Sequence, residues 1–224
     1  MSPCIGKCEL NSQGYCTSCH RSIDEITNWG KLNRLKRQYI MNKLPSRKID
    51  LKNVRDDLWQ IVKQEDNVVT IKGSITDLNL YPDTKCIIAH GCNDIGAWGA
   101  GVSGVISNTF PNAENMYRKS FKEPNKPKLG DIVYCTHWGS LILIANMITQ
   151  KGIRSKTNKH PFSYIAFKIA LEDLINTANK EKRTRIHIPK IGAGLGGGDW
   201  DTIYKLIKDL AANYKGTIVI HEYP

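Results

Sequence analysis

Residues 86–102, CIIAHGCNDIGAWGAGV, establish the fold class of this chain. The apolar run at 86–89 is typical of a buried strand, and a glycine-rich loop comes directly after it. Residues 185–200, RIHIPKIGAGLGGGDW, repeat the arrangement, because a short apolar strand again leads into a glycine-rich loop. A helix is predicted after each loop. Strand, loop and helix in this order predict an open α/β sheet with a ligand site beyond the carboxyl ends of its strands.

The two loops are expected to face each other at that edge of the sheet. Glycine lets backbone N–H groups approach a ligand closely, and the next helix contributes the positive end of its dipole. Two such loops would clamp a diphosphate; the alternative is that the glycines only make tight turns. The first loop lacks the Gly-Lys-Ser/Thr ending of a P-loop, and it also departs from the dinucleotide-binding fingerprint.

The remaining pattern alternates strands with helices, which predicts an α/β fold with a parallel or mixed sheet. Further strands are expected at 68–71, 131–135, 141–145 and 217–220. Helices are expected at 106–121, interrupted at Pro111, and at 162–179 and 200–214. We predict a domain over residues 67–224, preceded by a linker over 48–66 that carries a weak helical pattern.

The first 47 residues form a separate module that is rich in cysteine. Cys4, Cys8, Cys16 and Cys19 lie within a polar stretch that has no core of its own. Four thiolates at this spacing suit tetrahedral Zn²⁺ or an Fe–S cluster, and metal binding would supply folding energy. Zinc and iron–sulfur stay open as alternatives, as does an unliganded set of cysteines.

Short helices are expected after the cysteines. Ser22 and Glu25 have the spacing of a capping box. A second helix is predicted from Leu32 to Leu44, with Pro45 ending it.

Composition favours a globular protein with an anionic partner. The chain has 32 Lys and Arg against 21 Asp and Glu, a formal net charge of +11. A nucleotide, a nucleic acid or another polyanion fits this charge, although a merely soluble basic surface is the alternative. No apolar run reaches the roughly 20 residues of a membrane span. We expect a cytoplasmic protein without a membrane partner.

Two stretches resemble a known family. Residues His90 to Val102, together with Phe110-Pro111-Asn112-Ala113-Glu114, are similar to the first ligand loop of the macro domain (Appr-1″-p processing) family. Within it they most resemble the branch of ADP-ribose-1″-phosphate phosphatases. Residues 189–200 resemble the second, phosphate-holding loop, and residues 69–75 resemble the opening strand and turn. The resemblance spans residues 67–224.

The resemblance implies a three-layer αβα fold with a mixed sheet that binds ADP-ribose or a derivative and needs no cofactor. It places two residues near the adenine, six around the diphosphate and distal ribose, and five on the other side of the phosphates. These are Ser74 and Ile75; Asn93, Trp98, Gly99, Ala100, Gly101 and Val102; and Gly192, Gly194, Leu195, Gly196 and Gly197.

The same resemblance implies hydrolysis of ADP-ribose-1″-phosphate. His90 would act as a proton donor or acceptor, and Asp94 would orient water. The alternative for His90 is that it does no more than end its strand. We therefore expect a phosphoric-monoester hydrolase with His90 and Asp94 as its catalytic residues.

Two other functions remain open. A second branch of the family, which removes ADP-ribose from proteins or nucleobases, uses a lysine and an aspartate at positions that Gln150 and Gly196 occupy here. That change puts the lysine-based mechanism in doubt. A non-catalytic reader that docks ADP-ribosylated protein or nucleic acid is the third possibility.

The cysteine module resembles a small bacterial family of unknown function. The match runs over residues 2–45, and members are often described as predicted Fe–S proteins. It implies no activity, and it leaves recruitment of a partner, redox sensing and nucleic-acid binding open.

Overall fold

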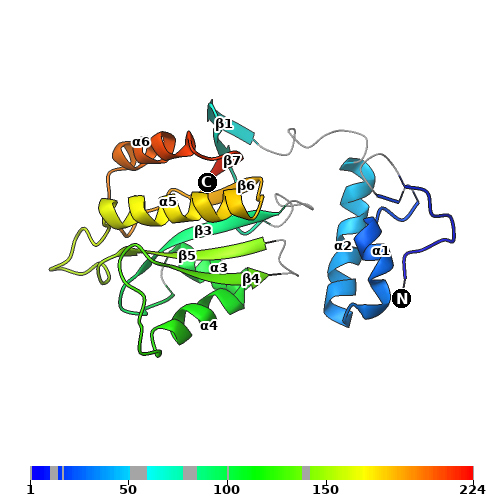
Figure 1. Cartoon of the computed structure of the whole chain (residues 1–224), viewed down its shortest axis with the longest axis horizontal. Coiled ribbons are helices and arrows are strands. Elements are labelled where there is room, and N and C mark those ends of the chain that lie inside the picture. The colour runs from blue at the N-terminus through cyan, green and yellow to red at the C-terminus, as the bar shows by residue number, and fades with distance from the viewer. Residues whose placement is uncertain are drawn as a thin grey trace. The chain divides into compact units, whose positions relative to one another are not determined.

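The structure, a computed structural model, describes residues 2–10, 15–16, 18–50, 60–77, 85–99, 101–137 and 142–223. The chain forms two compact units, Met1–Leu58 and Trp59–Pro224 (Figure 1). Each unit has its own packing and is described by itself. The middle of the expected linker, residues 51–59, lies outside the described residues.

The first unit holds helix α1 (Ile23–Thr27), the 3₁₀ helix η1 (Trp29–Lys31) and helix α2 (Arg34–Asp50). The predicted capping box is confirmed, because the Ser22 hydroxyl accepts from the Glu25 N–H and the Glu25 carboxylate accepts from the Ser22 N–H. The expected end of α2 at Pro45 is wrong, since the helix continues to Asp50. A proline removes one backbone hydrogen bond, and a helix can continue past it at that cost.

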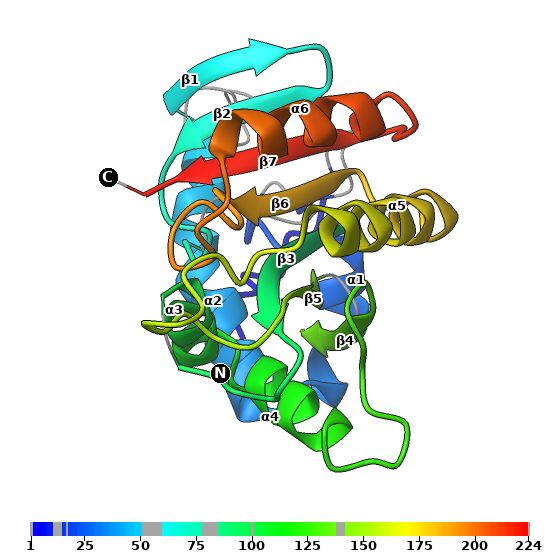
Figure 2. The same ribbon diagram turned by 90° about the vertical axis from the view of Figure 1, so that its left-hand side faces the viewer.

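The second unit is built on a mixed sheet. In the part of the chain that the structure describes, seven strands lie in the order β1-β2-β7-β6-β3-β5-β4 (Figure 2). The five central strands run parallel, while β1 and β4 pair antiparallel at the two edges. The strands are β1 (Gln60–Glu65), β2 (Val68–Lys72), β3 (Cys86–Asn93), β4 (Ile132–His137), β5 (Ile142–Gln150), β6 (Arg185–Pro189) and β7 (Thr217–Glu222).

The last part of the expected linker is strand β1 and not a helix. It pairs with β2 through a tight turn at Asp66 and Asn67, where Asp66 has a φ of 51°. The Asn67 amide donates to the carbonyls of Ala211, Tyr214 and Gly216. These long-range bonds hold the hairpin against the far end of the chain, so tertiary contacts override a weak local pattern.

Helices cover both faces of the sheet and complete three layers. In Figure 1, α5 (Tyr164–Lys180) and α6 (Trp200–Ala211) lie on one face, and α3 (Val102–Thr109) and α4 (Pro111–Ser120) lie on the other. Separate cores fill the two interfaces, with Phe167 and Leu171 in one and Ile106 and Phe110 in the other. The expected α/β fold with a mixed sheet is confirmed.

The sequence predicts no membrane-spanning segment. Among the described residues, no helix combines the length and the apolar character that crossing a bilayer requires.

Four histidines make the stability of the second unit depend on pH. Burial lowers the pKa of His90, His137 and His221 to about 4, and that of His187 well below 6.5. Between pH 6.5 and 4 the unfolded chain therefore binds protons that the folded chain does not.

We expect the free energy of unfolding to be highest above pH 6.5 and to fall toward pH 4. The slope is about 1.4 kcal/mol per pH unit for each histidine. Urea denaturation monitored by circular dichroism at pH 7, 6 and 5 measures this slope. In His221→Gln the free energy of unfolding should change less steeply with pH, by the contribution of one histidine. Equal stability at pH 7 and pH 5 would contradict the expectation.

Candidate ligand-binding site

A pocket of about 520 Å³ lies at the carboxyl ends of three parallel strands. Strands β3, β5 and β6 end at Asn93, Gln150 and Pro189, and all three residues line the pocket. This is where open α/β sheets bind ligands. The other lining residues are Gly91, Cys92, Ala97, Trp98, Gly99, Gly101, Val102, Ser103, Ile153, Arg154, Lys190, Ile191, Gly192, Gly194, Leu195 and Gly196.

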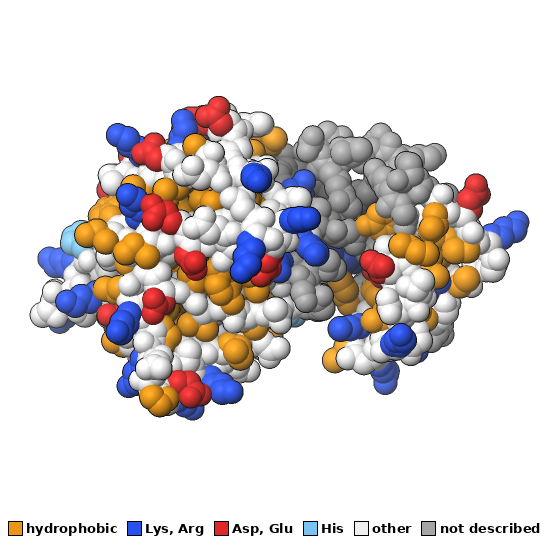
Figure 3. Space-filling view, in the orientation of Figure 1, with side chains coloured by type: hydrophobic (Ala, Val, Ile, Leu, Met, Phe, Trp, Pro, Cys, Tyr) orange, Lys and Arg blue, Asp and Glu red, His pale blue; other side chains and the backbone are white. Residues whose placement is uncertain are grey.

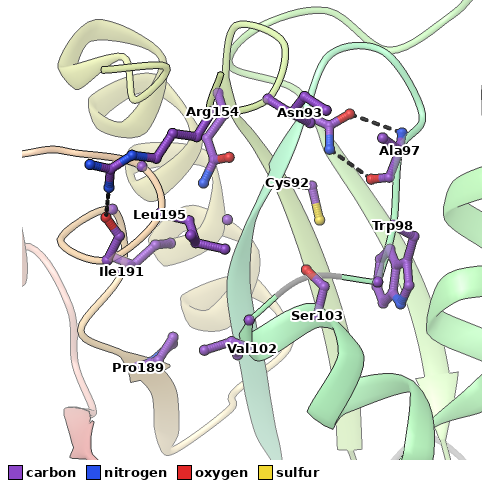
Figure 4. A pocket seen from close by; sticks show the side chains of 18 of the residues that line it. Cys92, Asn93, Ala97, Trp98, Val102, Ser103, Arg154, Pro189, Ile191 and Leu195 are labelled. Atoms are coloured by element: carbon purple, nitrogen blue, oxygen red, sulfur yellow. Dashed lines mark hydrogen bonds between the residues drawn. The ribbon is translucent and has the colours of Figure 1, made fainter. Parts of the chain in front are cut away.

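The Asn93 amide shapes the first loop and also lines the pocket. Its Oδ1 accepts from the Ile95 and Ala97 N–H groups, and its Nδ2 donates to the Ala97 carbonyl at 2.6 Å (Figure 4). The Tyr117 hydroxyl donates to the Asn93 backbone carbonyl at 2.7 Å and lies 3.0 Å from the same Oδ1. The Nδ2 group has two hydrogens and the bond to Ala97 uses one of them, so the predicted hydrogen bond from Asn93 to the distal ribose would use the other.

The first loop ends at the N-terminus of helix α3, which borders the pocket. Gly101 is the N-cap residue of α3 and has a φ of 59°, a conformation that side chains other than glycine rarely adopt. The first N–H groups of a helix have no partner within it. The loop therefore brings unpaired backbone donors beside the pocket-lining residues Val102 and Ser103.

The second loop contains glycines of two kinds. A Cβ on Gly196 would lie 2.6 Å from the Gly192 carbonyl oxygen, and one on Gly192 would lie 2.5 Å from the Phe162 ring. Packing therefore requires glycine at both positions. A Cβ on Gly194 would meet nothing within 4 Å, so this glycine borders open space. The loop is folded tightly on itself and presents bare backbone to the pocket.

Charge in the pocket is positive. Arg154 and Lys190 are the charged residues among the lining residues, and no described Asp or Glu lines it. Lys190 forms an ion pair with Glu222 at 2.6 Å. Arg154 reaches across toward the second loop, where its Nη1 lies 3.5 Å from the Gly194 carbonyl (Figure 4). Arg154 is exposed and is the cation best placed to meet an anionic ligand.

His90 lies beneath the pocket and does not line it. Its side chain is 1% exposed, and burial lowers its pKa to about 4. His90 Nε2 is 2.7 Å from Asn146 Oδ1 on the neighbouring strand, and His90 Nδ1 is 3.3 Å from the Ser103 hydroxyl. Direct proton exchange between His90 and a ligand, as the resemblance implied, does not fit this burial. Its neighbours Ser103, Cys92 and Trp98 line the pocket.

Asp94 holds two loops together and is not a pocket residue. Its Oδ1 accepts from the Gly152 N–H at 2.7 Å, and its own N–H donates to the Gln150 carbonyl. The loop after β3 is thereby joined to the loop after β5. The expected water-orienting role of Asp94 is not supported by this position.

The other predicted ligand residues divide into three groups. Trp98, Gly99, Gly101, Val102, Gly192, Gly194, Leu195 and Gly196 line the pocket. Ser74, Ile75 and Gly197 do not line it. The Ser74 hydroxyl is hydrogen-bonded to the Thr76 hydroxyl, Ile75 is buried in the core, and the Gly197 carbonyl is hydrogen-bonded to the His160 ring. Ala100 lies outside the described residues.

Two lining residues that sequence reasoning missed are Ser103 and Arg154. Ser103 is in the first turn of the helix after the first loop, a position that the helix N-terminus argument already indicated. Arg154 comes after β5, a third strand that ends at the same edge of the sheet. Arg154 could have been found by considering the segment after every parallel strand and not only the glycine-rich ones.

The four N-terminal cysteines belong to the other unit. Cys16 and Cys19 are buried, and Cys4 and Cys8 are exposed. The Cys16 thiol donates to the Lys7 carbonyl at 3.7 Å. Arg21 Nε donates to Cys19 Sγ at 3.3 Å. Among the described residues, no group of three or more His, Cys, Asp or Glu side chains is arranged to hold a metal ion.

Comparisons with known proteins agree with this architecture. A family model described as "Macro domain" matches residues 89–207, which is more than half of the chain. The chain belongs to the macro domain family. A model described as "Protein of unknown function (DUF1289)" matches residues 2–48, so a second family accompanies the macro domain.

Relatives of this macro domain include an enzyme and solved structures. An ADP-ribose 1″-phosphate phosphatase of Candida albicans is 30% identical over 139 residues, covering 58% of this chain and 85% of that protein. A macrodomain protein from Streptomyces coelicolor is 27% identical with a TM-score of 0.60, covering 70% of this chain and 99% of that chain. Thermosipho africanus DarTG in complex with ADP-ribose is 16% identical with a TM-score of 0.60, covering 73% of this chain and 43% of that chain, and shares the fold.

The two kinds of glycine in the second loop should respond differently to the same substitution. We expect Gly196→Ala to lower stability by about 2 kcal/mol, because the new methyl group meets backbone that has little freedom to move. For a chain of this size that lowers Tm by about 5 °C. Gly194→Ala is the matched control and should leave Tm within about 1 °C, because its methyl group enters open space. Equal melting temperatures for the two variants would contradict the loop geometry.

Proposed function

We propose that this macro domain binds ADP-ribose in the pocket and hydrolyses ADP-ribose-1″-phosphate to ADP-ribose and phosphate. The observation that carries the proposal is the pocket itself, which is walled by two glycine-rich loops and has cations but no described carboxylate in its lining. Such a site suits a ligand with several phosphate charges, since backbone N–H groups and a helix N-terminus favour anions.

The relatives support the choice of ligand and of reaction. The Candida albicans protein is named for the 1″-phosphatase reaction, and the Thermosipho africanus structure is titled as a complex with ADP-ribose. Gln150 lines the pocket where an ADP-ribosyl hydrolase of the family would have its lysine, and Gly196 stands in place of the aspartate. The phosphatase reaction is therefore preferred over removal of ADP-ribose from a protein or nucleic acid.

Arg154 has a defined part in this proposal. A guanidinium donates two parallel hydrogen bonds to a phosphate, and charge-assisted bonds are about twice as strong as neutral ones. Its present partner is a backbone carbonyl at 3.5 Å, a long contact that is readily exchanged for a phosphate oxygen. Arg154 would hold the terminal phosphate of ADP-ribose-1″-phosphate at the mouth of the pocket.

The test combines calorimetric titration with ADP-ribose and an assay of phosphate released from ADP-ribose-1″-phosphate. We expect the native protein to bind ADP-ribose and to release phosphate. Arg154→Gln should weaken binding of the phosphorylated ligand roughly tenfold, which corresponds to about 1.4 kcal/mol.

Lys151→Gln is the matched control, because it removes a nearby exposed cation that does not line the pocket. Absence of ADP-ribose binding would exclude the proposed ligand. Binding without phosphate release would leave a reader in place of an enzyme. An equal loss of affinity in the two variants would mean that Arg154 contributes only through general surface charge.

The face of the larger unit in Figure 3 shows no concentration of basic side chains of the kind that binds a nucleic-acid backbone. Figure 3 shows Lys and Arg side chains spread over the visible face of the larger unit, with acidic and hydrophobic side chains between them. A binder of the nucleic-acid backbone would concentrate them along one element or groove. The net charge of +11 is better explained here as favouring approach of an anionic small molecule.

We also propose that the N-terminal module binds Zn²⁺ or an Fe–S cluster through Cys4, Cys8, Cys16 and Cys19. The donor set fits either group chemically, and two of the four thiols, Cys16 and Cys19, are buried. Residues 2–10, which carry Cys4 and Cys8, are almost all exposed. When bound, the metal would supply the cross-link that this segment otherwise lacks.

Elemental analysis of the protein purified without air exposure tests the metal proposal. We expect about one equivalent of zinc, or iron together with acid-labile sulfide, and loss of nearly all of it in Cys16→Ser. Cys135→Ser, which changes a buried cysteine of the macro domain, should retain the metal. A metal-free native protein, or a Cys16→Ser variant as rich in metal as the native one, would refute the proposal.

A further inference from the structure

A chain of buried hydrogen bonds fixes the protonation of His90. Asn146 Nδ2 donates to the Ala113 carbonyl at 3.1 Å, so the oxygen of the same amide must face His90. An amide oxygen only accepts hydrogen bonds. His90 Nε2, 2.7 Å away, therefore carries the ring proton and donates it to Asn146 Oδ1. The other ring nitrogen, Nδ1, is left as an acceptor.

The acceptor nitrogen of His90 faces the pocket-lining Ser103. Its distance to Ser103 Oγ is 3.3 Å, while Cys92 Sγ is farther away at 3.8 Å. The Ser103 hydroxyl proton is therefore directed to His90. Ser103, one of the pocket-lining residues drawn in Figure 4, then presents oxygen lone pairs to the pocket and not a proton. The hydroxyl is oriented as a hydrogen-bond acceptor before any ligand arrives.

The surroundings hold this arrangement in place. His90 and Asn146 are paired residues on the adjacent parallel strands β3 and β5, and both side chains are buried. The Trp98 ring meets the His90 ring edge to face at 5.2 Å. A protonated His90 would donate from Nδ1 and reverse the Ser103 hydroxyl. Burial lowers the pKa of His90 to about 4, so the ring stays neutral at neutral pH and the direction of the chain is preserved.

We propose that Ser103 accepts a hydrogen bond from the water that attacks the phosphate, and that His90 and Asn146 act as positioning residues behind it. The inference rests on the proposed phosphatase function and assigns the group that orients the nucleophile. The described lining of the pocket contains no Asp, Glu or His that could do so directly. Ser103 also lies in the first turn of α3, beside the unpaired N–H groups that favour phosphate oxygens.

The reaction balances without a further reagent. The water oxygen forms a bond to phosphorus while the bond from phosphorus to the 1″ oxygen of the ribose breaks. One water proton remains on the released hydrogen phosphate, and the other ends on the 1″ oxygen of ADP-ribose. Ser103 keeps its own proton throughout and contributes orientation, which is the main task of a protein in phosphoryl transfer.

The experiment compares two serines of the same helix. Ser103→Ala removes the pocket-facing hydroxyl, while Ser107→Ala removes one that bonds the Gly104 carbonyl and does not line the pocket. We expect kcat for phosphate release from ADP-ribose-1″-phosphate to fall roughly 100-fold in Ser103→Ala, with the Kd for ADP-ribose within about threefold of the native value. Ser107→Ala should keep the native kcat, and Ser103→Thr, which retains a hydroxyl, should recover most of it.

A double variant tests whether His90 acts through Ser103. His90→Gln should lower kcat when Ser103 is present and should not lower kcat further in the Ser103→Ala background. If the two residues acted independently, the double variant would lose kcat by the product of the two single losses. Native-like activity in Ser103→Ala would overturn the inference and leave the phosphatase function standing. A fall in ADP-ribose affinity as large as the fall in kcat would also overturn it, because Ser103 would then bind the ribose. A native protein that binds ADP-ribose without releasing phosphate would overturn both proposals.

Discussion

The parallel pairing of β3 with β5 on one side and β6 on the other governs the geometry of the site. It brings three carboxyl-terminal strand ends to one edge, so that the segments after Asn93, Gln150 and Pro189 enclose a single pocket. Residues from distant parts of the chain become neighbours only through this register. The same pairing sets His90 opposite Asn146 and thereby fixes the direction of the hydrogen bonds beneath the pocket floor.

Around this edge, polar groups that the sequence pattern assigns to a ligand are used to build the pocket. The Asn93 amide closes the first loop, and the Asp94 carboxylate joins that loop to the one after β5. A buried polar group without a partner is costly, and both side chains have partners within the loops. The other polar groups of the described pocket lining include the Gln150 amide, the Ser103 hydroxyl, Lys190 and the exposed Arg154.

The cysteine module and the macro domain rest on different physics. The described part of the macro domain has buried apolar clusters on both faces of its sheet. The first unit has little buried apolar surface in its cysteine-bearing segment, where Cys16 and Cys19 are among the few buried residues. Residues 1–58 and 59–224 are separate compact units. The association with a second family at residues 2–48 is consistent with that separation.

Local signals in the sequence were enough for the α/β class, the order of strands and helices, the two glycine-rich loops and the Ser22 cap of α1, because hydrophobic periodicity, glycine clusters and capping residues act over a few positions. They did not reveal β1, whose residues 60–65 become a strand only by pairing with β2, nor the continuation of α2 past Pro45. Three features of the site came from the tertiary structure. His90 is buried and directed toward Ser103, Asp94 joins two loops by a hydrogen bond, and Arg154 lines the pocket. Burial and partners depend on which strands become neighbours, and no local pattern encodes that.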